Sequence, residues 1–139
     1  MEIDYQAAKL YVHNEHYYGR EMRRLFLLGA ILMLVSLPFF ASYISLGLTL
    51  SLSAIVILGI SAGLLNPLQP AIAILNLLIA VVACTIFEWQ ATMTFPGVSG
   101  ESDWFLFSIN QGLALIFFFA VYFGAKTVRG VFIHGKTVR

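Results

Sequence analysis

Glu88 has the most distinctive chemistry in this sequence, because it is a carboxylic acid inside a long apolar segment. Burying an ionised carboxyl group in hydrocarbon is costly, so a residue of this kind is a functional candidate by default. Counted from Ala71 at 1.5 Å per residue, Glu88 lies ~26 Å along a ~30 Å membrane crossing. It is then close enough to one boundary to reach interfacial water. Two interpretations follow, an interfacial carboxylate or a member of a functional polar cluster.

Other hydrogen-bonding side chains are expected at a depth similar to that of Glu88. The predicted outer-half polar cluster consists of Glu88, Thr85, Asn110, Gln111 and Ser53. Asn110 and Gln111 are adjacent and therefore ~100° apart on a helix, so we expect only one of them to face other helices fully. Such groups either bond helices together, at about 0.6 kcal/mol each, or line an outward-facing crevice. We favour interhelical bonding and keep the crevice as the alternative.

A metal site is not expected. His13 and His16 are the only pair at ligand-like spacing, and the segment around them matches neither zinc-protease pattern, HExxH or HxxEH. Two imidazoles alone make a weak site, and the apolar segments contain no histidine that could ligate haem. Cys84 is the single cysteine and is interpreted as a small packing residue. The sequence therefore predicts no catalytic residue, metal or cofactor.

The distribution of charge predicts the environment that must position these side chains. Hydrophobic residues make up 60% of the 139 residues, charged residues 11%, and the mean hydropathy is +0.87. No lysine or arginine lies between Leu25 and Ala125. A soluble fold would need charge along such a stretch, so we predict a membrane protein. The eight basic residues are Lys9, Arg20, Arg23, Arg24, Lys126, Arg129, Lys136 and Arg139.

Four apolar segments, each near the ~20 residues that cross a bilayer, occupy residues 25–44, 47–65, 71–92 and 104–125. They predict an all-α integral membrane protein, with these four transmembrane helices in one bundle forming a domain over residues 25–125. The first two segments are nearly continuous, so residues 45–47 must form a tight turn. The alternative is a single bent or re-entrant element.

Both ends of the chain are expected on the cytoplasmic side, because basic residues accumulate there. An even number of crossings satisfies this requirement, and Glu101 and Asp103 then lie in an outer loop. Trp89 and Trp104 flank that loop, as expected of indoles at a membrane interface. The predicted location is multi-pass in a membrane, the cytoplasmic membrane if the protein is bacterial.

The two ends of the chain are expected to have different structures. Residues 1–24 carry apolar side chains at helical spacing and predict an N-terminal amphipathic helix lying in the interface. Arg20, Arg23 and Arg24 would then lie at the level of the lipid phosphates, either as topological anchors or as a lipid-headgroup site. Residues 126–139 are expected to form a basic C-terminal tail containing a β-leaning run at 131–134.

Function is the least determined property. Gly59 and Gly63 form a small-xxx-small motif that favours close helix packing. We expect a non-enzymatic accessory, assembly or structural subunit that contacts the lipid bilayer and either other membrane subunits or its own copies, with no nucleic-acid partner. The alternative is a small channel, holin-like pore or proton-linked carrier that uses Glu88 with Asn110 or Gln111. A membrane enzyme would need several convergent titratable groups, and Glu88 alone qualifies.

Overall fold

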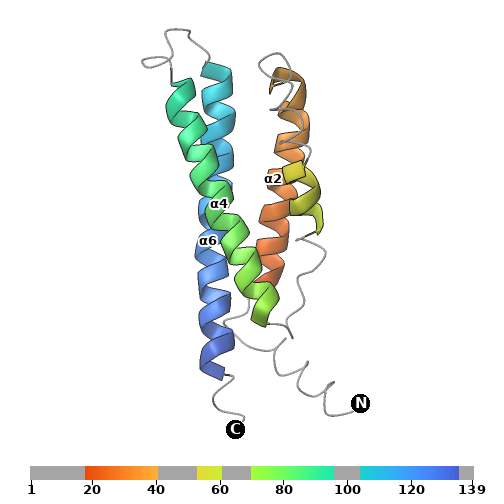
Figure 1. The fold of residues 1–139 in the computed structure, drawn as a ribbon, viewed down its shortest axis with the longest axis vertical. Helices are drawn as coiled ribbons and strands as arrows, with labels where there is room; N and C mark the ends of the chain where they lie inside the picture. Colours follow the sequence, from red (N-terminus) through yellow and green to blue (C-terminus); the bar gives the residue numbers. More distant parts are fainter. Residues whose placement is uncertain (1–17, 41–52, 61–69, 96–103, 135–139) are drawn as a thin grey trace.

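The computed structural model describes residues 18–40, 53–60, 70–95 and 104–134, and the structural statements below refer to these residues (Figure 1). They form helix α2 (Gly19–Phe40), a helical segment at 53–60, helix α4 (Pro70–Thr94) and helix α6 (Trp104–His134). The regular structure in the described part of the chain is thus all helical, as the sequence predicts.

Two of the helices are long and apolar enough to cross a membrane. They are α4, with 25 residues and a mean hydropathy of 2.5 in its most apolar window, and the Trp104–Phe132 part of α6, with 29 residues and 1.8. In the most apolar stretch, 17% of α4 and 33% of α6 is buried. Both helices therefore keep most of this apolar stretch exposed. The core helix of a soluble protein would be mostly buried, and lipid contact explains this exposure better.

Helix α2 has a polar start and an apolar remainder. Its first turns carry the charged residues Glu21, Arg23 and Arg24. The described apolar part, residues 25–40, extends about 24 Å along the helix at 1.5 Å per residue. Helix α2 begins at Gly19, within the predicted N-terminal segment 1–24, so Arg20, Arg23 and Arg24 belong to the same helix as the start of the predicted first span.

The predicted limits of the last two segments agree well with the helices at three of four ends. Helix α4 begins one residue before Ala71, α6 begins at Trp104 as predicted, and α4 ends at Thr94. The fourth end differs, because α6 continues to His134 instead of stopping near Ala125. The β-leaning interpretation of residues 131–134 was therefore wrong.

Packing against α2 accounts for the extra turns of α6. Thr127 is 2% exposed and its hydroxyl accepts a hydrogen bond from the backbone N–H of Tyr18 at 3.3 Å. The ring of Tyr18 lies 5.4 Å from that of Phe123. These contacts join residues more than one hundred positions apart, so local sequence preference could not reveal them.

The predicted N-terminal amphipathic helix lies mostly outside the described residues, as do the C-terminal tail beyond residue 134 and both ends of the predicted second span. Within that span, residues 53–60 are helical and lie beside α2 (Figure 1).

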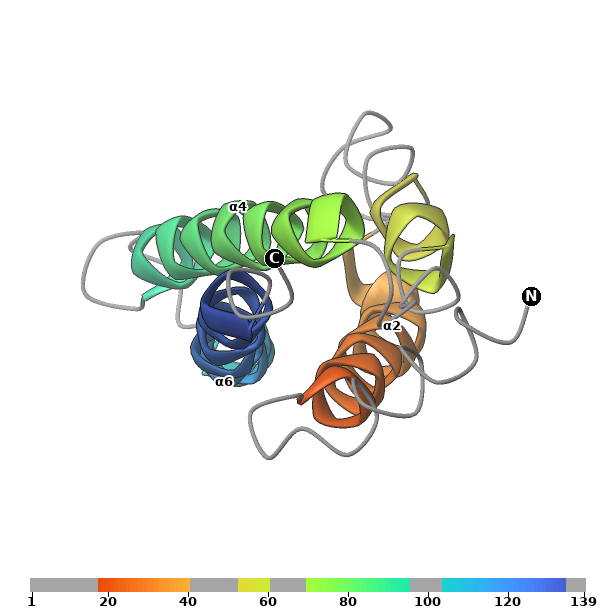
Figure 2. The ribbon, with the colours of Figure 1, turned by 90° about the horizontal axis from the view of Figure 1, so that it is seen from below.

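Helix α6 is the central element of the fold, since it packs against both α4 and α2 (Figure 2). It runs antiparallel to both, so the start of α2, the start of α4 and the end of α6 lie at one end of the molecule (Figure 1). The fully buried ring of Phe117 on α6 lies between the other two helices, at the centre of the core. It stacks on Phe87 of α4 at 5.6 Å and lies 6.2 Å from Phe26 of α2.

Two glycines allow the helices to approach each other at this core. A Cβ at Gly29 would lie 2.9 Å from Cζ of Phe117, and one at Gly124 would lie 3.0 Å from Cε of Met22 and 3.1 Å from Cδ1 of Leu77. Both glycines therefore mark places where helices touch closely, as small residues do in membrane bundles.

Candidate functional site

Glu88 and Gln111 meet on the surface of the α4–α6 pair. The Gln111 amide Nε2 donates to Oε1 of Glu88 at 3.5 Å, between residues that are 23 apart in sequence. The antiparallel packing of the two helices brings them together. This distance is at the long limit of a hydrogen bond, and the pair is exposed, so the contact is weak.

Asn110 is the member of the adjacent pair that faces the helix interface. Its side chain is fully buried, and its Nδ2 donates to the hydroxyl of Thr94 at 3.5 Å. The Thr94 hydroxyl in turn donates to the carbonyl of Gln90 at 2.8 Å. Oδ1 of Asn110 has no hydrogen-bond partner among the described residues.

The five predicted cluster residues are therefore not one site. Glu88 contacts Gln111, and Asn110 contacts Thr94, a residue that sequence reasoning missed. Thr85 is exposed and donates to the carbonyl of Val81 in its own helix at 2.9 Å. Ser53 is exposed at the start of the helical segment 53–60. Thr94 was missed because nothing local indicates which residue of α4 lies opposite Asn110.

Most described hydroxyl groups bond to the backbone of their own helix. Thr92 donates to the carbonyl of Glu88 at 2.9 Å, Ser108 to that of Trp104 at 2.7 Å, and Ser36 to that of Met33 at 2.9 Å. A hydroxyl that donates to its own helix has no proton left to donate to another helix, although Thr94 and Thr127 still accept a bond from a residue outside their own helix. One further buried polar group stands out, Asn76, whose Nδ2 lacks a partner among the described residues.

An aromatic cluster closes the end of the α4–α6 pair that carries Glu88. The rings of Phe95, Trp104 and Phe107 lie 5.4 to 6.0 Å from one another in edge-to-face arrangements. Trp104 and Trp89 are both largely exposed. Indoles in this position are typical of a membrane–water interface, where the predicted orientation also places them.

Basic residues gather at the opposite end of the molecule, where α2 begins. Arg20, Arg23 and Arg24 are all exposed in the first turns of α2. Arg24 forms an ion pair with Glu21 at 3.1 Å. Arg20 and Arg23 form no ion pair with any other residue that the structure describes.

The end of α6 adds further positive charge near the start of α2. Nζ of Lys126 lies 4.7 Å from the ring centre of Tyr122 and 5.2 Å from that of Tyr18. Arg129 is exposed one turn later. The start of α2 and the end of α6, which carry the described basic residues, thus lie at one end of the molecule, away from the end where α4 stops and α6 begins (Figure 1).

The predicted packing motif falls only partly within the described residues. Gly59 is exposed, and no described atom lies within 4 Å of a Cβ placed there. Gly63 lies outside the described residues, as do His13 and His16. Cys84 is half-buried and its Sγ lies 3.6 Å from the carbonyl of Ala114, in the α4–α6 contact. Within the described ranges, no three His, Cys, Asp or Glu residues converge as metal ligands.

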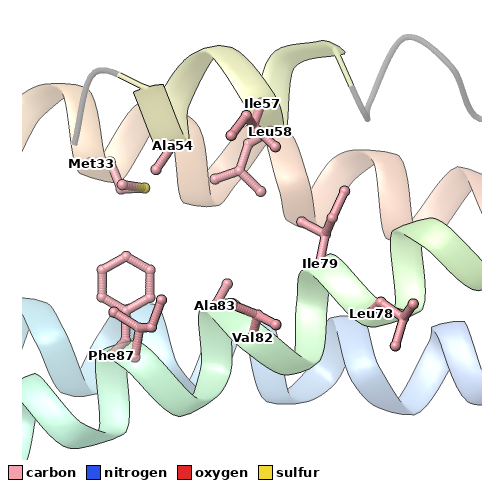
Figure 3. Close-up of a pocket in the computed structure, with 10 residues that line it drawn as sticks. Met33, Ala54, Ile57, Leu58, Leu78, Ile79, Val82, Ala83 and Phe87 are labelled. Atoms are coloured by element: carbon pink, nitrogen blue, oxygen red, sulfur yellow. The ribbon is translucent and has the colours of Figure 1, made fainter. Parts of the chain in front are cut away.

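A hollow of about 360 Å³ lies between α2, the helical segment 53–60 and α4 (Figure 3). Its wall is almost wholly apolar. The lining residues are Met33, Ala54, Ile57, Leu58, Leu78, Ile79, Val82, Ala83, Ile86 and Phe87. Sequence reasoning missed this hollow, because a space between three helices leaves no signal in apolar residues.

Comparison with known proteins gives no further guide to this site: no protein-family model, curated protein or solved structure matches the chain.

Proposed function

We propose that the protein crosses the membrane four times with both ends in the cytoplasm. Support comes from the directions of the helices, because α2 and α4 both start at the basic end of the molecule (Figure 1). A return crossing at the predicted segment 47–65 accounts for these two directions, and the described residues 53–60 of that segment are helical. With this second crossing the proposed total is four, and α6 brings the chain back to the basic end.

Within this topology, the protein acts as a non-enzymatic accessory, assembly or structural subunit that works through helix contacts. One observation carries this proposal: most described hydroxyl groups bond to the backbone of their own helix, while the outward surface is apolar. The described side-chain hydrogen bonds between helices and their ends are long. They are Gln111–Glu88 and Asn110–Thr94 at 3.5 Å, Cys84 Sγ to the Ala114 carbonyl at 3.6 Å, and the Tyr18 N–H to the Thr127 hydroxyl at 3.3 Å. A surface of this kind recognises other helices or lipid, and offers little chemistry to a polar substrate.

Cysteine crosslinking in native membranes tests the proposal. Cys84 is first replaced by alanine, and single cysteines are placed at the exposed positions Val35, Val81 and Phe118, one on each helix. We expect one of these faces to form a crosslink, to a second copy or to another membrane protein, while the others stay uncrosslinked. A cysteine at the buried Leu113 is the control for non-specific reaction.

The contrary result is equally clear. If no face crosslinks, and the protein extracted in native-lipid nanodiscs has the mass of a single chain, the subunit proposal fails.

The Glu88–Gln111 contact favours a second candidate, a small channel, pore or proton-linked carrier. Glu88 is the one carboxyl group within the apolar part of α4, and Gln111 lies 3.5 Å away. Proton and ion flux is measured with the protein reconstituted in vesicles, using Glu88→Gln and, as a control that keeps the carboxyl group, Gln111→Leu. Flux that is the same in wild type and Glu88→Gln removes this role for the carboxyl group.

A further inference from the structure

The hollow between α2, segment 53–60 and α4 has the dimensions and lining of a binding site for an apolar chain. Met33 forms its wall on α2, Ala54 and Leu58 on segment 53–60, and Ala83 and Phe87 on α4 (Figure 3). Its volume of about 360 Å³ falls within the ~300–1,000 Å³ typical of ligand sites. Left empty, the wall would lose the dispersion contacts that close packing supplies.

The positively charged Arg23 lies about as far from this hollow, along α2, as one leaflet of the membrane is thick. Arg23 is exposed and forms no ion pair with another described residue, whereas Arg24 is paired with Glu21. Met33 comes ten residues after Arg23, which places it about 15 Å further along α2. One leaflet contributes half of the ~30 Å hydrocarbon layer, also about 15 Å.

Arg23 and Arg24 lie on different sides of α2, and only one of these sides is near the hollow. At ~100° per residue, Arg23 lies ~80° from Met33 around the helix, while Arg24 lies ~180° away, on the opposite side. Arg23 is therefore the arginine of the pair that can hold a headgroup above the hollow.

We propose that the hollow holds one acyl chain of an anionic phospholipid from the cytoplasmic leaflet, with the lipid phosphate bound by Arg23. The positive charge of Arg23 suits an anionic headgroup. The distance of about 15 Å from Arg23 to Met33 matches the length of one acyl chain in a leaflet. The inference rests on the proposed topology only in that Arg23 lies at the membrane surface. It does not depend on whether the protein is a subunit or a carrier.

Native mass spectrometry of the detergent-purified full chain tests this proposal, with phosphatidylglycerol and phosphatidylcholine as the probes. We expect one retained lipid per chain, with phosphatidylglycerol preferred. Arg23→Gln should lower the preference for phosphatidylglycerol about fivefold, the contribution of one cation near an anionic lipid surface. The matched change Arg24→Gln should leave the preference within about twofold.

Filling the hollow provides the second arm. Ala83→Phe and, from the opposite wall, Ala54→Leu should each reduce retention of both lipids at least tenfold while the helical circular dichroism is unchanged. Using two walls guards against one variant failing to fold.

Several outcomes would overturn the proposal. Equal effects of Arg23→Gln and Arg24→Gln would mean diffuse attraction to the whole basic end. Undiminished lipid retention in a folded Ala83→Phe or Ala54→Leu variant would place the acyl chain elsewhere. A crosslink from Ile57→Cys, in the hollow, to a second polypeptide would show that a protein helix occupies it. A different outcome separates the two proposals. If the protein is a monomer and still retains phosphatidylglycerol, the subunit proposal is wrong and the lipid site is supported.

Discussion

At the scale of single residues, Gly29 shows how much a missing side chain can matter. It faces Phe117, which is fully buried between Phe87 and Phe26 and so has little freedom to move away. The predicted packing residue Gly59 is, by contrast, exposed. The small residues that set helix separation here were not those that the small-xxx-small pattern indicated.

Gly29→Ala should therefore be less stable than Gly59→Ala by about 1–3 kcal/mol, the usual cost of overpacking a core. Both substitutions sit in helices and gain the same ~1 kcal/mol of helix propensity, so their difference isolates the clash. Thermal unfolding in one detergent measures it. A Gly29→Ala protein as stable as Gly59→Ala would contradict the close α2–α6 approach.

Asn110 is a second residue whose role its surroundings define. Its Oδ1 is buried without a described partner, and its amide makes a bond of only 3.5 Å to Thr94. Replacing a poorly satisfied buried polar group by an apolar one of similar shape is nearly neutral or stabilising.

Asn110→Leu should accordingly change stability by less than about 1 kcal/mol or increase it, because the Thr94 hydroxyl keeps its bond to Gln90. The change is measured by thermal unfolding, with Asn110→Ala as a control that leaves a cavity. A loss above ~2 kcal/mol with leucine would mean that Oδ1 is hydrogen-bonded in the complete protein.

At the scale of elements, the last turns of α6 hold the start of α2 in place. The Thr127 hydroxyl accepts the N–H of Tyr18, and it donates to the carbonyl of Phe123 at 2.9 Å. This explains why α6 extends beyond the predicted transmembrane segment. Thr92 also bonds to its own helix, through Glu88, but it is exposed and is therefore a useful comparison.

Thr127→Val should lower stability by about 1 kcal/mol, the net value of one hydrogen bond, and should speed hydrogen exchange at the first amides of α2. Thr92→Val should change neither quantity measurably. Hydrogen exchange followed by mass spectrometry makes the comparison. Unchanged exchange in Thr127→Val would show that α2 is held at its start by other contacts.

At the scale of the whole molecule, the two ends of the bundle differ in chemistry. The α4–α6 end carries Trp89, Trp104 and the weak Glu88–Gln111 contact, and the opposite end carries the arginines and Lys126. This polarity is what orientation in a membrane requires.

The orientation can be measured with single cysteines in a Cys84→Ala background. We expect Met93→Cys to react with a membrane-impermeant thiol reagent in intact cells. Arg20→Cys should react only after the membrane is permeabilised. The reverse pattern would invert the proposed topology, and labelling of both positions from outside would rule out the three crossings proposed between Arg20 and Met93.

What the sequence determined by itself was the environment and the rough helix limits. Removing lysine and arginine from residues 25–125 leaves hydrocarbon as the favoured surroundings, and this is a property of composition that needs no tertiary contact. The proline at 70 also places the start of α4 correctly, because proline is favoured in the first turn of a helix, where its missing N–H is not needed.

Only the tertiary structure decided which faces of the helices meet. It selected Asn110 over Gln111 for the interior, Gly29 and Gly124 as the close contacts, and the apolar hollow beside Met33. The physical reason is that α4 and α6 are apolar on nearly every side, so hydrophobic periodicity carries no information about direction. In lipid, shape complementarity between distant residues makes that choice.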